Sequence, residues 1–137
     1  MRTKMLILII LFMVSNLYGS DDFLNKSLIC STASFPIKGG FYFQSNKELT
    51  RYNILWDNDL RQEYLKTTKH CYMIVNKEII ISERNSNNNC GNYNTFIDLN
   101  TMIYSIPTNQ KIFSANCKFY DGDVHKVLMN SLNADMN

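Results

Sequence analysis

The stretch CYMIVNKEIIISERNSNNNCGNYNTFID, residues 71–98, contains the clearest hairpin signal in the chain. Its apolar run 72–75 is followed by the polar pair Asn76-Lys77 and then by residues 78–84, which are rich in β-branched side chains. Two such runs joined by a two-residue polar link predict a β-hairpin, with Asn76 taking the positive φ that the turn requires. Beyond this hairpin the composition changes. Residues 85–89 form an asparagine-rich loop, which we interpret as a solvated linker, and Gly91-Asn92 predicts a further turn.

The first 20 residues have the organisation of a secretory signal peptide. Arg2 and Lys4 form a positive start, residues 5–14 are continuously apolar, and the small residues Gly19 and Ser20 mark a cleavage site. The apolar run is shorter than the roughly 20 residues that a membrane-spanning helix needs. We therefore expect a signal peptide over residues 1–20, a single domain over residues 21–137, and a secreted or periplasmic location in a bacterium.

The charge balance argues against a nucleic-acid ligand. The chain has 14 basic and 12 acidic residues, and removal of Arg2 and Lys4 with the signal leaves 12 of each. A formally neutral mature chain with scattered cations lacks the basic patch that neutralises phosphate backbones. We expect no nucleic-acid partner and no membrane span after signal cleavage.

Four cysteines, all in the mature part, predict two disulfides. An even cysteine count behind a secretory signal favours oxidation over metal binding or catalysis. Three pairings are compatible with the sequence. We favour Cys71–Cys90, which closes the hairpin and loop, and Cys30–Cys117, which ties the first strand to the last. Each bond is expected to contribute about 2–4 kcal/mol. No pair has the spacing of a zinc site, and we expect no metal or cofactor.

The rest of the mature chain alternates short β-patterned runs with turn signals. Further strands are expected at 28–30, 41–44, 49–56, 94–100, 101–106 and 111–120, whereas 60–69 is predicted to be a strand or an irregular edge. Turns are expected at Gly39-Gly40 and at Asn100-Thr101, and Pro36 and Pro107 are expected to end segments. In 49–56 we expect the face with Tyr52, Ile54 and Trp56, and not the face with Leu49, Arg51, Asn53 and Leu55, to enter the core.

A short helix is predicted at 124–132, capped by Asp123, with Val124, Val127, Leu128 and Leu132 on one side. About eight short strands with turns every 8–12 residues are typical of a sandwich or a small barrel. The predicted fold is all-β and mainly antiparallel, a small meander sandwich or barrel in which the C-terminal helix covers an open edge or end.

Candidate catalytic residues are few. A Cys–His pair would use Cys71 with one of the two histidines, His70 and His125, but Cys71 is expected in a disulfide, and His70 adjoins it in sequence and so points to the opposite strand face. The acidic clusters at 57–59 and 121–123 resemble pieces of a calcium loop without its continuation, and a turn and a helix cap explain them more simply. Asp121, Asp123 and His125 are the candidate ligands if a metal were bound. No catalytic or metal-binding residues are expected.

Two segments, CSTASFPIKGGFYF (30–43) and FIDLNTMIY (96–104), together with Cys117, resemble small uncharacterised secreted proteins of Gram-negative bacteria. Those proteins also have a cysteine near the mature start, a Gly-Phe-aromatic strand and a cysteine near the end, and the resemblance implies no activity. A looser likeness is to periplasmic lysozyme inhibitors, which are small disulfide-tied β-barrels. Their inhibitory Ser-Gly-x-x-Tyr loop is matched best by Asn89-Cys90-Gly91-Asn92-Tyr93, which lacks the serine.

Together these patterns predict a monomeric, non-enzymatic binding module for a protein or a cell-envelope component, acting through loops or an exposed sheet edge. One alternative is a small hydrolase whose site is not visible as a motif. It predicts a pocket that holds His70 or His125 beside carboxylates with perturbed pKa values. Two further alternatives are a lysozyme-inhibitor-like protein and a structural envelope protein without a ligand.

Overall fold

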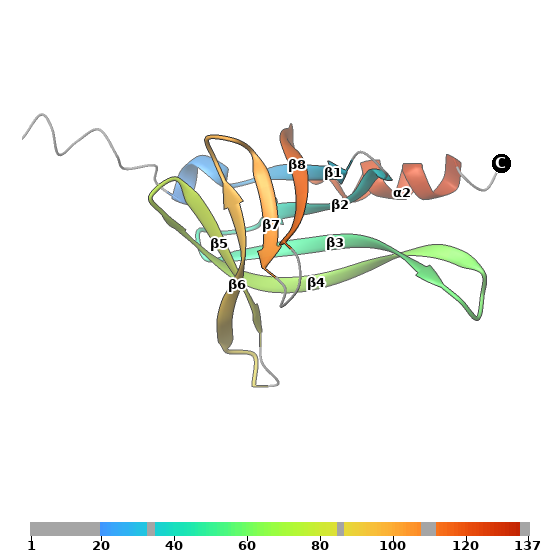
Figure 1. The fold of residues 1–137 in the computed structure, drawn as a ribbon, viewed down its shortest axis with the longest axis horizontal. Helices are drawn as coiled ribbons and strands as arrows, with labels where there is room; N and C mark the ends of the chain where they lie inside the picture. Colours follow the sequence, from blue (N-terminus) through green and yellow to red (C-terminus); the bar gives the residue numbers. More distant parts are fainter. Residues whose placement is uncertain (1–19, 33–34, 85–86, 108–111, 135–137) are drawn as a thin grey trace, which may run out of the picture.

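The computed structural model describes residues 20–32, 35–84, 87–107 and 112–134, which fold into a closed antiparallel β-barrel (Figure 1). Each strand is hydrogen-bonded to the next in the sequence, and β8 pairs with β1 to close the barrel. The strands are β1 Lys26–Thr32, β2 Phe35–Phe43, β3 Glu48–Asp57, β4 Gln62–Val75, β5 Glu78–Arg84, β6 Cys90–Asp98, β7 Ile103–Pro107 and β8 Ile112–Asp121. A 3-10 helix, η1 Ser20–Phe23, precedes them and an α-helix, α2 His125–Ala134, follows. The predicted antiparallel meander with a short C-terminal helix is confirmed. Of the two architectures expected from the sequence, sandwich or barrel, the structure has the barrel.

The β4–β5 turn forms as its residue types require. Asn76 and Lys77 both have positive φ, 50° and 62°, and Val75 pairs with Glu78 across them. Positive φ at both central residues gives the turn the twist that the flanking strands need. The hairpin predicted from residues 72–84 is therefore confirmed.

One end of the barrel interior is filled by apolar side chains. Phe23 of η1 lies across this end, with its ring centroid 5.5 Å from that of Phe43 and 5.6 Å from that of Phe119. Strand alternation brings the other members of this core inward: Leu28, Cys30, Phe41, Leu49, Tyr72, Ile79, Ile81, Ile97, Tyr104, Ala115 and Cys117. We call this the closed end of the barrel, and the opposite end the mouth.

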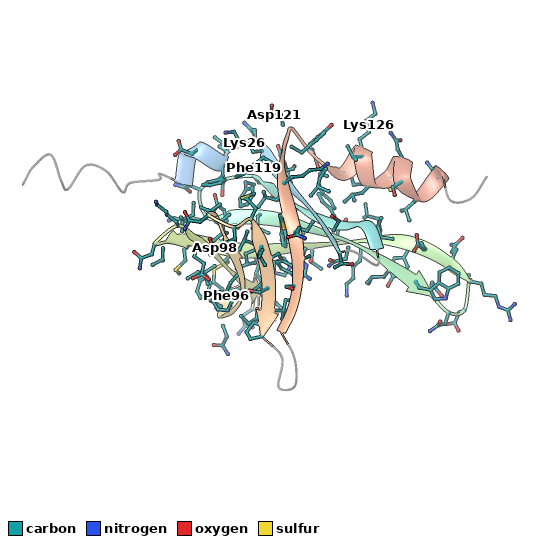
Figure 2. All side chains as sticks on the ribbon, turned by 45° about the horizontal axis from the view of Figure 1, so that its top comes forward. Lys26, Phe96, Asp98, Phe119, Asp121 and Lys126 are labelled. Carbon is teal, nitrogen blue, oxygen red and sulfur yellow. A yellow bond between two sulfur atoms is a disulfide. The ribbon has the colours of Figure 1, made fainter. Side chains whose placement is uncertain are left out.

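Helix α2 covers part of the outer face of the barrel. Its side chains Leu128 and Leu132, together with Val124 just before the helix, form a second core with Ile29, Tyr52 and Ile54. A Cβ at Gly40 would lie 2.8 Å from the Leu28 carbonyl oxygen and 3.0 Å from Val124 Cγ1, so close packing against β1 and against the residue before α2 disfavours a side chain there. Asp123 Oδ1 accepts a hydrogen bond from the His125 amide (2.8 Å), which confirms the predicted cap. Lys126 lies on the side of α2 that faces away from the strands (Figure 2).

Three predicted chain breaks are wrong. Gly39-Gly40 lies inside β2, and Gly91-Asn92 lies inside β6. The glycines serve close packing and not turns: a Cβ at Gly39 would lie 2.7 Å from the Tyr52 carbonyl oxygen, and one at Gly91 would lie 2.8 Å from that of Glu83. Pro36 also lies within β2, ahead of the segment that pairs with β3, where its missing N–H removes no bond to that strand.

The ambiguous segment 60–69 belongs mainly to β4, which pairs with β3 on one side and β5 on the other. Pairing with β3 continues to Asp57 and Gln62, so the β3–β4 hairpin projects well beyond the barrel (Figure 1). Near its tip, Trp56 and Leu60 have exposed fractions of 58% and 67%. The prediction that Trp56 enters the core is therefore wrong, because Trp56 lies in the part of β3 that extends beyond the barrel.

The predicted core face of β3 is right for Tyr52 and Ile54, but they are buried beneath α2 and not inside the barrel. The opposite face of β3 enters the barrel, with Leu49 in the interior core. The helix does not cover an open edge, because ring closure by β1 and β8 leaves none. It packs instead on the outer surface of the ring.

Two disulfides link the strands. Cys30–Cys117 joins directly paired positions of β1 and β8, and Cys71–Cys90 joins β4 to the start of β6. These are the pairs favoured above, and no cysteine is left as a free thiol.

The signal-peptide prediction falls almost entirely outside the described residues, which begin at Ser20, and it stays a prediction. Within the part of the chain that the structure describes, no helix is long and apolar enough to cross a membrane.

Candidate functional site

At the mouth of the barrel, the described residues line two adjoining cavities. The inner cavity has a volume of about 200 Å³, and the outer cavity, of about 540 Å³, is more open. Arg51, Asn53 and Leu55, alternate residues of β3, line both. Since β3 runs from the closed end outward, its inward face passes from buried Leu49 to Arg51 at the level of the mouth.

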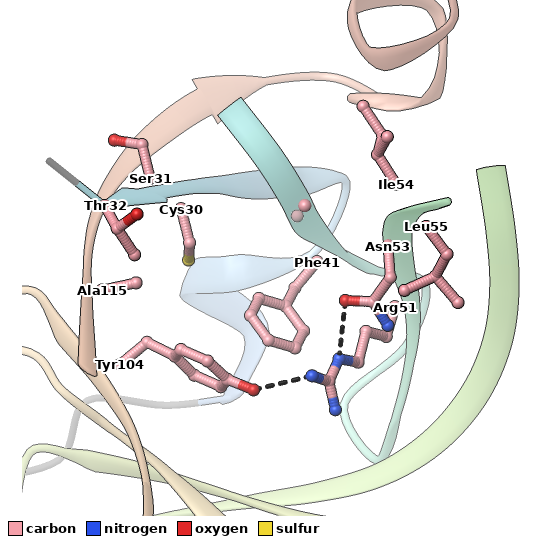
Figure 3. A pocket seen from close by; sticks show the side chains of 12 residues that line it. Cys30, Ser31, Thr32, Phe41, Arg51, Asn53, Ile54, Leu55, Tyr104 and Ala115 are labelled. Carbon is pink, nitrogen blue, oxygen red and sulfur yellow. Dashed lines mark hydrogen bonds between the residues drawn. The ribbon is translucent and has the colours of Figure 1, made fainter. Parts of the chain in front are cut away.

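Arg51 is held at the boundary between the cavities by neutral groups. Its Nη2 donates to the Tyr104 hydroxyl oxygen (2.7 Å) and its Nε donates to Asn53 Oδ1 (3.3 Å), as Figure 3 shows. The guanidinium carbon lies 5.9 Å from the ring centroid of Phe41 and 5.7 Å from that of Tyr104, within the range of cation–π attraction. Among the described residues, Arg51 has no carboxylate partner. Its positive charge is positioned but not neutralised.

The inner cavity has mainly apolar walls. They are formed by Cys30, Gly39, Gly40, Phe41, Ile54, Leu55, Tyr104 and Ala115, and its polar lining comes from Ser31, Thr32, Arg51 and Asn53. The buried hydroxyl of Thr32 has no hydrogen-bond partner among the described residues. Burial raises the pKa of Tyr104, although Arg51 opposes the shift, so the phenol stays protonated at neutral pH. An apolar chamber with one cation and a few hydroxyl groups results.

The outer cavity is polar. Besides the three shared β3 residues, it is lined by Lys66, Thr68, Lys69, His70, Glu83, Arg84 and Asn88. Arg84 is already engaged, since it forms an ion pair with Glu48 and donates to Asn88 Oδ1 (2.8 Å). Lys66, like Arg51, has no carboxylate partner among the residues that the structure describes.

His70, a candidate from the sequence, lies in this outer wall and is buried. Its Nδ1 is 3.2 Å from the Ser82 carbonyl oxygen, and its Nε2 is 2.8 Å from Thr68 Oγ1. Burial lowers the pKa of His70, and the nearby Arg51 lowers it further, against opposing effects of Ser82 and Glu83. The imidazole is therefore neutral at pH 7. Because a carbonyl can only accept, Nδ1 carries the proton and Nε2 accepts from the Thr68 hydroxyl.

His125, the second candidate, is not brought near His70. It lies exposed at the start of α2, outside the barrel, with its ring centroid 5.5 Å from that of Tyr52. Cys71 is oxidised, so no thiolate is present for the Cys–His pair considered above. One feature expected for a hydrolase is present, because His70 and Glu83 line the same cavity.

The acidic clusters have local structural roles. Asp57 Oδ1 accepts hydrogen bonds from the amides of Asp59 (2.9 Å) and Leu60 (3.0 Å) in the β3–β4 turn. Asp123 caps α2, and its other oxygen accepts a hydrogen bond from the Tyr52 hydroxyl (3.3 Å). Burial and this carboxylate raise the pKa of Tyr52 to about 12. Nowhere in the described ranges do three or more His, Cys, Asp or Glu side chains gather as a metal site would require.

Sequence reasoning missed Arg51, Asn53, Thr32 and Tyr104 as site residues. A signal was present in β3, where Arg51 alternates with Leu49 and Leu55, so a cation shares a strand face with two leucines. This pattern predicts a buried cation only if that face of β3 enters the barrel interior, which depends on how the barrel closes.

Comparisons with protein-family models, with curated proteins and with solved structures find no match to this chain.

Proposed function

We propose that this protein is a non-enzymatic binding protein that holds a small anionic ligand in the mouth of its barrel. The observation that carries the proposal is Arg51, a half-buried guanidinium that faces a cavity and has only neutral partners among the described residues. Removing a charge from water is costly unless an opposite charge compensates it. A bound anion would supply that compensation.

The architecture supports a ligand of limited size. The interior of an eight-stranded barrel is either filled by side chains or holds one small ligand. Here the closed end is filled, and the inner cavity at the mouth leaves about 200 Å³. An engineered protein cavity of about 150 Å³ takes up benzene. A ring-sized apolar body therefore suits the inner cavity, with its acidic group directed at Arg51.

The test compares benzoate with its neutral isostere benzamide. We expect benzoate to bind and to shift the amide NMR signals of Gly39 and Gly40, and benzamide to bind at least about tenfold more weakly because it cannot pair with the guanidinium. Arg51→Gln should remove the preference for benzoate, whereas Arg51→Lys should keep part of it. Arg61→Gln, which removes the same charge at the exposed hairpin turn, is the control.

Two results would contradict the proposal. The first is benzoate affinity that is unchanged in Arg51→Gln. The second is hydrolysis of p-nitrophenyl acetate that disappears in Thr68→Val, because the Thr68–His70 contact has the geometry of a nucleophile with its base. Binding is favoured over hydrolysis because His70 has an exposed fraction of only 5%, and a backbone carbonyl, not a carboxylate, orients its ring.

The protein or envelope partner expected from the sequence remains compatible with this proposal, since the ligand can be a small envelope component. We place the ligand at the mouth and not at the exposed tip of the β3–β4 hairpin because the mouth combines a cavity with an uncompensated cation. A secreted or periplasmic location is part of the proposal. It is supported by the N-terminal sequence and by the two disulfides, which persist in oxidising compartments.

A further inference from the structure

We propose that the ligand carries a doubly charged anionic head, bound jointly by Arg51 and Lys66 where the two cavities meet. This inference rests on the proposed function and adds the charge of the ligand and a second binding residue. Arg51 is common to both cavities, whereas Lys66 lines only the outer one. The apolar body of the ligand would then lie in the inner cavity, and its head would face the outer cavity.

The register of the β3–β4 pair brings the two cations within reach of one head group. Arg51 pairs with Thr68 and Asn53 pairs with Lys66, so Arg51 and Lys66 are diagonal neighbours. Diagonal neighbours in an antiparallel pair are about 7–8 Å apart, and long side chains bridge such a gap. Because strand alternation places Lys66, Thr68 and His70 on the inward face of β4 with buried Tyr72, both cations face the same space.

The charged side chains around Arg51 and Lys66 leave a net positive field where the two cavities meet. Among the described residues of the outer cavity, Arg84 is paired with Glu48, and Lys69 lies on the outward face of β4. Glu83 of β5 pairs with His70 of β4. His70 is four residues from Lys66 along β4, which corresponds to about 13 Å at the usual rise per strand residue. Glu83 therefore lies beside His70 and too far from Lys66 to neutralise it.

Phenyl phosphate and phenyl sulfate form a matched pair of probes. They have nearly the same shape, but at pH 7.5 a phosphate monoester is mainly a dianion, with a second pKa near 6, whereas a sulfate monoester is a monoanion. We expect phenyl phosphate to bind about tenfold more tightly, measured by calorimetry or by NMR titration of the Gly39 and Gly40 amides. A third probe, phenylsuccinate, distinguishes a dicarboxylate from a phosphate ligand by its affinity relative to phenyl phosphate.

Lys66→Gln should weaken phenyl phosphate binding by about tenfold and phenyl sulfate binding by less, because the dianion interacts more strongly with the lysine, so the preference for phenyl phosphate should become smaller. Lys66 is exposed, so its loss is not expected to affect folding. Lys47→Gln, which removes an exposed lysine at the closed end, is the control and should change neither affinity. His70 gives a second readout, because the dianion should raise its pKa more than the monoanion does.

The outcomes separate the two proposals. If both probes bind equally and both require Arg51, the doubly charged head is wrong and the proposed function stands. If phenyl phosphate binds more tightly but Lys66→Gln has no effect on it, the assignment of Lys66 is wrong. If neither probe nor benzoate binds, the proposed function fails, and with it the inference.

Discussion

His70 is a buried ionisable side chain of the barrel wall, and each of its ring nitrogens has a hydrogen-bond partner. Arg51 faces it from β3, Glu83 from β5, and Thr68 and the Ser82 carbonyl engage its two nitrogens. Burial and Arg51 together hold the pKa of His70 below its ordinary value of 6.5, so the folded protein binds this proton less readily than the unfolded chain. Between pH 6.5 and the lower native pKa, protonation therefore favours unfolding.

We expect the free energy of unfolding to fall as the pH is lowered from 7.5 to 5.0, with a slope from His70 of at most about 1.4 kcal/mol per pH unit. Urea unfolding across this range measures the slope. His70→Gln should flatten it, whereas His125→Gln, at an exposed position, should not. An identical pH dependence in wild type and His70→Gln would show that other groups cause it.

At the scale of elements, α2 is held to the barrel by one apolar stripe. Leu128 of α2 and Val124 just before it are fully buried, and Gly40 of β2 lies against Val124. The stripe covers the outer face of the wall whose inner face carries Arg51, because Arg51 and Tyr52 are consecutive residues on opposite faces of β3. Packing of α2 therefore supports the strand that positions the candidate site.

Leu128→Ala should lower the free energy of unfolding by about 3 kcal/mol, because a fully buried leucine loses its transfer free energy and leaves a cavity. Met129→Ala, one residue away on the exposed side of α2, should change stability by less than about 0.5 kcal/mol. Chemical denaturation measures both. Equal small effects would mean that α2 contributes little to the stability of the barrel.

At the scale of the whole molecule, the two disulfides constrain the chain very differently. Cys30–Cys117 spans 87 residues and ties the two strands that close the ring, whereas Cys71–Cys90 spans 19. In the chain-entropy model, the stabilisation grows with the length of the closed loop, which gives about 4.6 and about 3.2 kcal/mol.

The double variant Cys30→Ala with Cys117→Ala removes the disulfide that closes the longer loop. It should lower the free energy of unfolding by about 1.4 kcal/mol more than Cys71→Ala with Cys90→Ala does. Urea unfolding of the two double variants tests this order. A larger loss from the shorter loop would show that packing in the folded barrel, and not the entropy of the unfolded chain, sets the contribution of each bond.

The sequence by itself determined the features that depend on neighbouring residues. Positive φ at Asn76-Lys77, the cap at Asp123, the apolar side of α2 and the alternation along each strand follow from local chemistry. The sequence favoured one cysteine pairing among three compatible ones, because one bond closes a local unit and the other joins the first and last strands, and the structure has this pairing.

Only the tertiary structure decided which strand faces point inward. Ring closure through β1 and β8 placed Arg51 inside the mouth, buried Tyr52 beneath α2, and left Trp56 exposed on a hairpin that outruns the ring. It also turned Gly39-Gly40 from an expected turn into part of a strand that packs closely against its neighbours. These outcomes arise from contacts between residues far apart in the sequence, for which local periodicity contains no signal.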